Sequence, residues 1–110
     1  MKLPPSMRSR KRYIAFRVIN KGRVDDRAIL EAMVKNLITL FGETSTAECG
    51  LKLEEFDGEK GIVRCNLEAL DRVMIALTLI DKVGEENIAL LTLGVSGTLK
   101  GCRKKLGVLV

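Results

Sequence analysis

Apolar residues alternate with other residues between positions 12 and 19, and this period of two predicts a β-strand. Ile14, Phe16 and Val18 fall on one side of the strand, which is wholly apolar and is therefore expected to face the core. The other side is mixed, because it includes Tyr13 and Arg17. We expect that side to be only partly covered or to meet a partner.

Two longer stretches repeat apolar residues at helical spacing. The first runs from a cap at Asp25 or Asp26, whose carboxylates can accept amides of a first helical turn, to about Phe41. The second runs from a cap at Asn66 to about Val83. The stripes expected to face the core are Leu30, Met33, Val34, Leu37, Leu40 and Phe41 in the first helix, and Leu70, Val73, Leu77 and Ile80, widened by Ala69, Met74 and Ala76, in the second.

Three further strands are predicted, at residues 51–56, 61–65 and 88–95. An Asp57-Gly58 pair between the first two of these is a strong signal for a hairpin turn. Residues 43–50 remain ambiguous between a loop and one short helical turn.

The order β-α-β-β-α-β is typical of an α/β (α+β) sandwich of the RRM-like or ferredoxin-like kind, with two helices on one face of a four-stranded antiparallel sheet. Right-handed crossovers place the first strand centrally, beside the third and the fourth. We therefore predict a flexible basic arm at residues 1–11, a single domain at residues 12–105 and a C-terminal tail at residues 106–110.

Charge is distributed unevenly along the 110 residues. Residues 1–24 contain eight lysines and arginines and residues 87–110 contain four, and neither segment has an acid; the middle holds all fourteen acids and seven bases. Such segregation favours a polyanionic partner, most often a nucleic acid, over terminal charges that merely aid solubility.

The predicted topology brings the two basic ends together. The first and fourth strands are antiparallel neighbours, so the start of one lies at the same sheet edge as the end of the other. Basic residues from both ends should then form one patch that neutralises phosphates, with Arg17 and Arg64 as weaker candidates. The predicted RNA-binding residues are Arg8, Arg10, Lys11, Arg12, Lys100, Arg103, Lys104 and Lys105.

Residue types needed for common catalysis are missing. The chain has no histidine, which excludes Ser-His and Cys-His pairs and leaves its three cysteines short of a usual zinc site. We expect free thiols, no catalytic residue, and no metal or cofactor bound by this chain. The acids Glu54, Glu55, Asp57 and Glu59 could hold Mg²⁺, but a solvated hairpin is the favoured interpretation.

The order of elements invites comparison with RRM domains, which stack bases on aromatic side chains of the third and first strands. Here the third strand has no aromatic residue, and Tyr13 and Phe16 in the first point to opposite faces. RNA would therefore be bound through phosphate contacts and shape, which are salt-sensitive and only weakly sequence-specific.

Three segments resemble archaeal ribonuclease P protein component 2, the Pop-five family: L-P-P-S-M-R-S-R-K-R-Y-I-A-F-R-V-I at 3–19, F-D-G-E-K-G-I-V-R-C-N at 56–66 and T-L-G-V-S-G-T-L-K at 92–100. The resemblance implies an RRM-like sandwich and a part in removing the 5′ leader from precursor tRNA. It implies that the RNA subunit and its Mg²⁺ ions are the catalyst and that this chain is a non-catalytic accessory.

The resemblance also implies protein partners. These are protein component 3, with which a heterotetramer can form, and the other ribonuclease P proteins. It accounts for the mixed face of the first strand as a protein interface or as a surface covered by a segment such as residues 43–49.

Two alternatives remain at this point. One is a ferredoxin-like regulatory module, without RNA, that binds a small anion at the turn of residues 94–98; the other is a metal-dependent nuclease using residues 54–59. The sequence has no apolar run of membrane-spanning length and no apolar signal core, so we expect a cytoplasmic protein without membrane contact.

Overall fold

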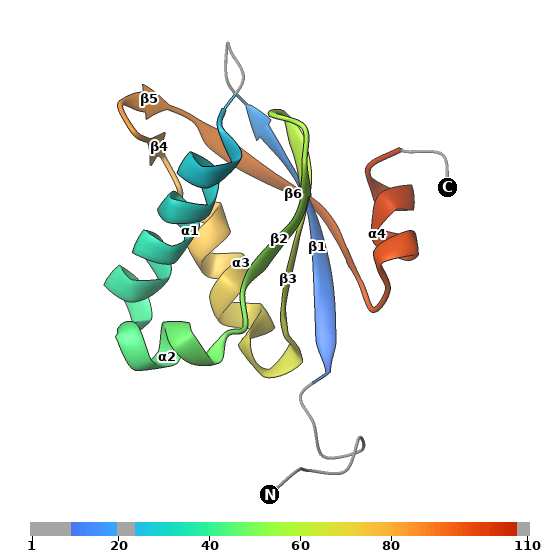
Figure 1. Cartoon of the computed structure of the whole chain (residues 1–110), viewed down its shortest axis with the longest axis horizontal. Coiled ribbons are helices and arrows are strands. Elements are labelled where there is room, and N and C mark those ends of the chain that lie inside the picture. Colours follow the sequence, from blue (N-terminus) through green and yellow to red (C-terminus); the bar gives the residue numbers. More distant parts are fainter. Residues whose placement is uncertain (1–9, 20–23, 108–110) are drawn as a thin grey trace, which may run out of the picture.

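A four-stranded antiparallel sheet forms the centre of the computed structural model, which describes residues 10–19 and 24–107 (Figure 1). The strand order is β2-β3-β1-β6, so β1 lies between the third strand and the last, as predicted. The strands are β1 (Lys11–Ile19), β2 (Lys52–Phe56), β3 (Lys60–Asn66) and β6 (Ala89–Ser96).

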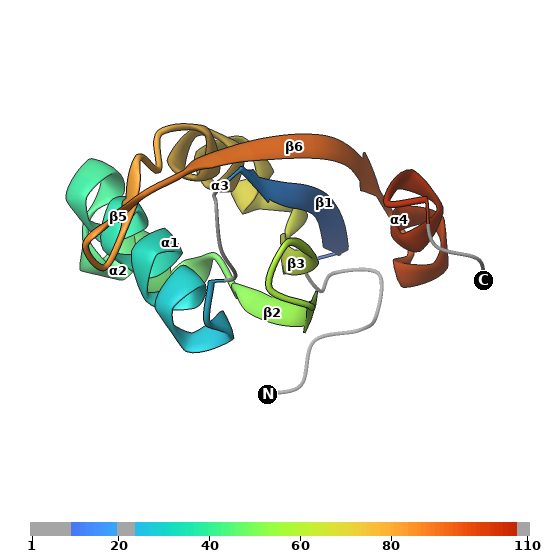
Figure 2. The ribbon, with the colours of Figure 1, turned by 90° about the horizontal axis from the view of Figure 1, so that it is seen from above.

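Helices lie on both faces of this sheet (Figures 1 and 2). Three α-helices and a short 3₁₀ helix form a helical layer on one face, and α4 (Leu99–Lys105) lies on the other. The elements of the helical layer are α1 (Asp26–Phe41), α2 (Glu43–Glu48), η2 (Leu67–Ala69) and α3 (Leu70–Thr78). The predicted α+β sandwich is therefore confirmed, with α2 at the ambiguous segment and α4 as an additional element.

The buried stripe of α1 differs from the predicted one. Ile29, Met33 and Leu37 are its buried residues, whereas Leu30 and Val34 are half-buried and Leu40 is exposed. The helix is apolar on several sides, so periodicity alone could not decide which side faces the sheet. Asp25 occupies the N-cap position as predicted, but its side chain makes no capping hydrogen bond.

The second predicted helix is too long. α3 ends at Thr78, and the following residues form a small hairpin of β4 (Lys82–Val83) and β5 (Glu86–Asn87). Gly84 has φ of 61°, a left-handed conformation that suits the two-residue turn between Val83 and its partner Glu86. Asn66 occupies the N-cap position of η2, directly before α3, as predicted, but its side chain makes no capping hydrogen bond.

The main core lies between the sheet and the helical layer. Ile14 and Phe16 of β1 are fully buried there, as predicted, and Phe16 stacks on Phe56 with ring centroids 5.8 Å apart. The predicted β2–β3 hairpin is present, and Asp57 Oδ1 accepts hydrogen bonds from the amides of Glu59 and Lys60.

Candidate nucleic-acid interface

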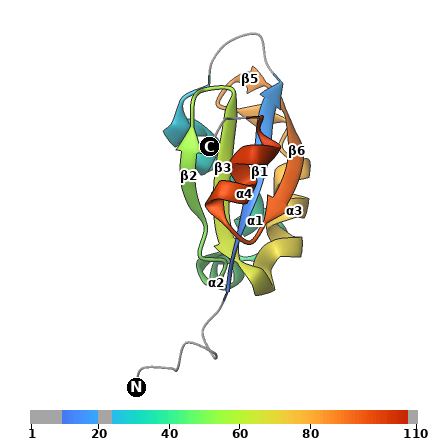
Figure 3. The same ribbon diagram turned by 90° about the vertical axis from the view of Figure 1, so that its right-hand side faces the viewer.

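The sheet face opposite the helical layer, which we call the outer face, is covered at its centre by α4 (Figure 3). Ala15 and Ile62 are fully buried on this face beneath Cys102 and Leu106 of the C-terminal segment. The segment of residues 43–49 therefore does not cover the outer face. Its helix α2 lies in the helical layer and packs against α1. The central outer face of an RRM, where bases would stack, is occupied here by the protein itself.

Local sequence explains why α4 forms. Thr98 is its N-cap, and the Thr98 hydroxyl accepts a hydrogen bond of 3.0 Å from the Gly101 amide. Leu99, Cys102 and Leu106 recur at helical spacing and pack on the sheet. This cap and this spacing are the sequence signals for α4, which is absent from the predicted elements because the segment is short and dominated by basic residues.

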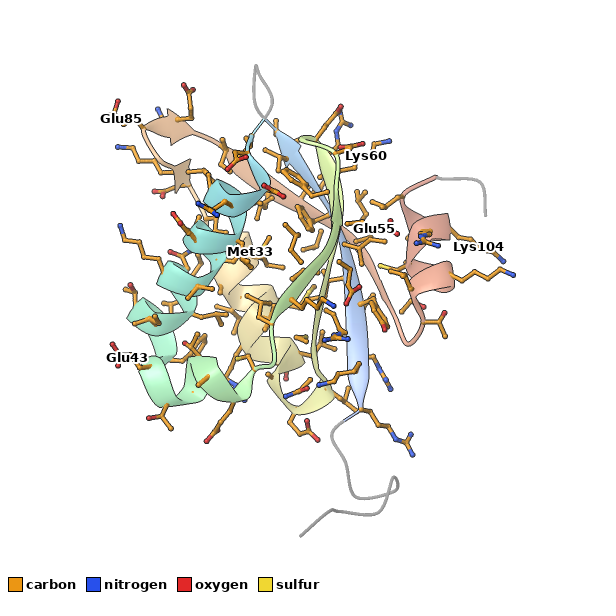
Figure 4. All side chains as sticks on the ribbon, in the orientation of Figure 1. Met33, Glu43, Glu55, Lys60, Glu85 and Lys104 are labelled. Carbon is orange, nitrogen blue, oxygen red and sulfur yellow. The ribbon has the colours of Figure 1, made fainter. Side chains whose placement is uncertain are left out.

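Arg103 fixes α4 to the neighbouring strand. Its guanidinium donates to Glu55 Oε1 on β2 through Nε, at 2.7 Å, and through Nη2. This hydrogen bonding raises the pKa of Arg103. Glu55 lies between the sheet and α4, whereas Lys104 extends away from the sheet (Figure 4). The Arg103 side chain is thus held by Glu55, whereas the side chains of Lys100 and Lys104 are exposed.

The side chain of Lys105, the last residue of α4, lies against Gly94 of β6. A Cβ atom added at Gly94 would overlap the aliphatic part of this side chain, so a larger residue there would displace it. Gly94 belongs to the turn region considered above for a small anion. The Lys105 stem already occupies the space over that glycine.

The basic arm is anchored where β1 begins. Asn66 accepts a hydrogen bond from Lys11 Nζ through its side-chain oxygen, and it donates to the Glu48 carbonyl at 2.8 Å. The Leu67 amide donates to the Arg10 carbonyl at 2.6 Å. Arg10 is exposed beyond this anchor, and Arg8 lies outside the described residues.

The two basic segments meet as the strand pairing requires. Tyr13 lies opposite Ser96, and a Cβ atom added at Gly97 would lie 3.7 Å from Arg12 Nη1. The start of β1 is thus adjacent to the turn that leads into α4. From that turn α4 runs back along the sheet, so its C-terminal end lies farther from the start of β1 than its N-terminal end does (Figure 3).

The two sides of the protein have opposite charge. In the helical layer and the small hairpin, residues 26–48 and 67–87 include nine acidic and four basic residues. Residues 10–19 and 99–105 include eight basic residues and no acidic residue, and the β2–β3 hairpin beside them, residues 52–66, adds three basic and four acidic residues. A polyanion would therefore be attracted to the side that carries β1 and α4.

The three cysteines offer no activated nucleophile. Cys49, Cys65 and Cys102 are free and fully buried. Burial raises the pKa of each thiol, to about 11 for Cys65 and for Cys102, so these groups stay protonated near neutral pH.

Among residues 10–19 and 24–107, no group of three or more acidic residues or cysteines is arranged to hold a metal ion. In the acidic hairpin, Glu54, Glu55 and Glu59 each face a basic side chain instead. Within the same residues, no helix is long and apolar enough to cross a membrane.

Fold and site together define an RRM-like α+β domain with a basic side and an extra helix over its sheet. The family model described as Rpp14/Pop5 family matches residues 12–107, and the chain belongs to that family. The family predicted from the sequence is thereby confirmed.

Named relatives agree with this assignment. The chain is 57% identical to ribonuclease P protein component 2 of Archaeoglobus fulgidus over 103 residues, which cover 94% of both proteins. It is 37% identical to the component 2 protein of Pyrococcus horikoshii, covering 94% of this chain and 88% of that protein.

A solved structure shares the fold. A chain in a cryo-EM structure of yeast ribonuclease MRP superimposes with a TM-score of 0.68 and 11% identity, covering 92% of this chain and 88% of the yeast chain.

Proposed function

We propose that this chain is a protein subunit of ribonuclease P, the ribonucleoprotein that removes the 5′ leader from precursor tRNA. Its part is to bind and support the catalytic RNA, and it supplies no catalytic residue. Membership of the Rpp14/Pop5 family and the names of its archaeal relatives support this role. The observation that carries the RNA-binding part is the segregation of charge between the two sides of the domain.

The mechanism is electrostatic. Folding brings RNA helices close together, and their phosphates repel one another unless cations intervene. Exposed side chains at the arm and on α4 would supply fixed positive charge, so the folded RNA would need fewer Mg²⁺ ions for its stability. The residues proposed for this contact are Arg8, Arg10, Arg12, Lys100, Lys104 and Lys105. Lys11, which bonds to Asn66, and Arg103, which bonds to Glu55, are proposed to contribute positive charge as well.

The proposal extends to partners and location. We propose that protein component 3 and the other ribonuclease P proteins assemble with this chain in the cytoplasm, with a heterotetramer as one arrangement. Apolar side chains on the helical layer support protein contacts, since Ile75 and Leu79 of α3 are about half exposed, at 47% and 55%. The acidic helical layer would then face proteins while the basic side faces RNA.

Reconstitution of the holoenzyme tests the proposal. Arg10, Arg12, Lys100 and Lys104 are changed together to alanine, and cleavage of precursor tRNA is measured over a range of Mg²⁺ concentrations. We expect the variant to require more Mg²⁺ for half-maximal cleavage and to approach normal rates when Mg²⁺ is high. The controls are two variants of equal charge: Lys100 and Lys104 changed to alanine, and Lys35 and Lys82 of the opposite side changed to alanine. Equal Mg²⁺ requirements for the variant, both controls and the unmodified chain would overturn the proposal.

A further inference from the structure

The end of the outer face where β1 begins is left open by α4. Across this end, Lys52 of β2 lies opposite Arg64 of β3, and Arg64 lies opposite Tyr13 of β1. One row further out, Lys11 lies opposite Asn66. Directly opposed residues project from the same face of an antiparallel pair, so Lys52, Arg64 and Tyr13 share the outer face, while Lys11 lies at the end of the sheet, bonded to Asn66. We call these two rows the basal rows.

In the basal rows the basic side chains outnumber the acidic side chain that lies beside them. Glu54 is the acid beside them, 3.5 Å from Arg64 and 3.8 Å from Lys52, so one carboxylate serves two cations. The Lys52 side chain is 59% exposed, whereas that of Glu54 is 17% exposed. Lys52 is therefore the more solvent-exposed partner of this ion pair.

The opposite end of the outer face differs. Arg17 has a carboxylate of its own, since it pairs with Glu59 at 3.1 Å, and Arg103 pairs with Glu55. The sequence makes both Arg17 and Arg64 weaker candidates for phosphate contacts. The pairings now separate the two: Arg17 is matched one to one, whereas Arg64 shares its acid with Lys52.

We propose that the RNA-binding surface extends from Arg10 and Lys11, where β1 begins, across the basal rows to Lys52 at the β2 edge, and that it takes the phosphodiester backbone of RNA. The path runs at right angles to the strands. Because neighbouring strands lie about 4.8 Å apart, Lys52 and Tyr13 are separated by about 10 Å across the sheet. The RNA backbone would lie along this direction. This inference rests on the proposed function and adds to it two residues, Lys52 and Arg64.

The sheet thus retains a part in RNA binding, although α4 occupies its centre. The contact is electrostatic, and Tyr13 packs against the cluster beneath α4, so base stacking on the open sheet is not required. Phosphate contacts of this kind position the RNA without reading its sequence.

Binding of the full-length chain to ribonuclease P RNA of Archaeoglobus fulgidus, transcribed in vitro, tests the inference. Dissociation constants are measured at several salt concentrations for Lys52→Ala, for Arg64→Lys, and for a Lys100→Ala/Lys104→Ala marker variant. We expect Lys52→Ala to weaken binding several-fold and to lower the salt slope by about one unit, the effect of losing one phosphate contact. Arg64→Lys keeps the charge and should lower the slope little.

The control is Lys35→Ala on α1, an exposed lysine of the acidic side. Thermal unfolding should be nearly unchanged in Lys52→Ala, because exposed ion pairs contribute little to stability. If the marker variant binds weakly while Lys52→Ala binds normally, the basal rows are excluded and the proposed function stands. If Lys35→Ala loses as much affinity as Lys52→Ala, the effect is one of net charge and the inference is overturned. If no variant changes binding, the proposed RNA contact itself fails.

Discussion

Leu106 offers a way to loosen α4 without disturbing the main core. It is 7% exposed and belongs to a small cluster with Ala15, Ile62 and Cys102, separate from the core beneath the helical layer. Leu106→Ala removes three carbon atoms from this cluster, worth about 2.4 kcal/mol of transfer free energy. A residual cavity adds to that loss, but α4 lies at the surface and can shift to fill part of it. We expect α4 to be destabilised by about 2–3 kcal/mol.

Hydrogen exchange measures this effect directly. The Cys102 amide donates to the Thr98 carbonyl and the Leu106 amide donates to the Cys102 carbonyl, so both report on α4. A loss of about 2 kcal/mol corresponds to exchange about 30-fold faster at these amides, while amides of β1 should change much less. Lys104→Ala on the exposed side of α4 is the control.

Two results would refute the reasoning. Unchanged exchange at Cys102 and Leu106 would mean that the small cluster does not hold α4. Equal acceleration in α4 and β1 would mean that α4 and the main core open as one unit, so that the helix is not separately attached.

Two further predictions concern the core and the anchor of the arm. Burial raises the pKa of Cys65 and Cys102 to about 11 from 9.0, so the folded state holds these protons more tightly than the unfolded state. The free energy of unfolding should therefore fall as pH rises from 9 towards 11, by up to about 1.4 kcal/mol per pH unit for each thiol. In urea denaturation Cys102→Ala should show a shallower decline with pH, and equal slopes would contradict the assignment. Asn66→Ala removes the hydrogen bonds to Lys11 and to the Glu48 carbonyl, so we expect the free energy of unfolding to fall by about 1–2 kcal/mol and hydrogen exchange at the Leu67 amide to become faster. Asn87→Ala, at an exposed position, is the control. Unchanged exchange at the Leu67 amide would count against the anchoring role of Asn66.

Topology was predictable because it depends on a few robust signals. The alternating strand at residues 12–19, the Asp57-Gly58 turn and the two helical repeats determine the order of elements, and right-handed crossovers then place β1 in the centre. The adjacency of the arm and the turn before α4 followed from antiparallel pairing alone, and Tyr13 lies opposite Ser96 as that pairing requires.

Details that depend on tertiary packing were not predictable in the same way. Ile29 rather than Leu30 faces the core of α1, since both are apolar and only the position of the sheet distinguishes them. The hairpin at Val83 and Glu86 replaced the end of a predicted helix because Gly84 adopts a left-handed turn. Within the site, the sharing of Glu54 between Lys52 and Arg64 depends on a register that composition does not reveal.

The pairing of β1 with β6 bears on when the proposed RNA-binding surface is completed during synthesis. Tyr13 emerges from the ribosome early, but Ser96 and the residues of α4 emerge only when nearly all of the described chain has been made. Closing so long a loop is slow, since contacts between distant residues carry an entropic cost before they stabilise the fold. A nascent or truncated chain would thus carry the basic residues at the start of β1 without those of α4, and the proposed surface would be complete only when both have folded together.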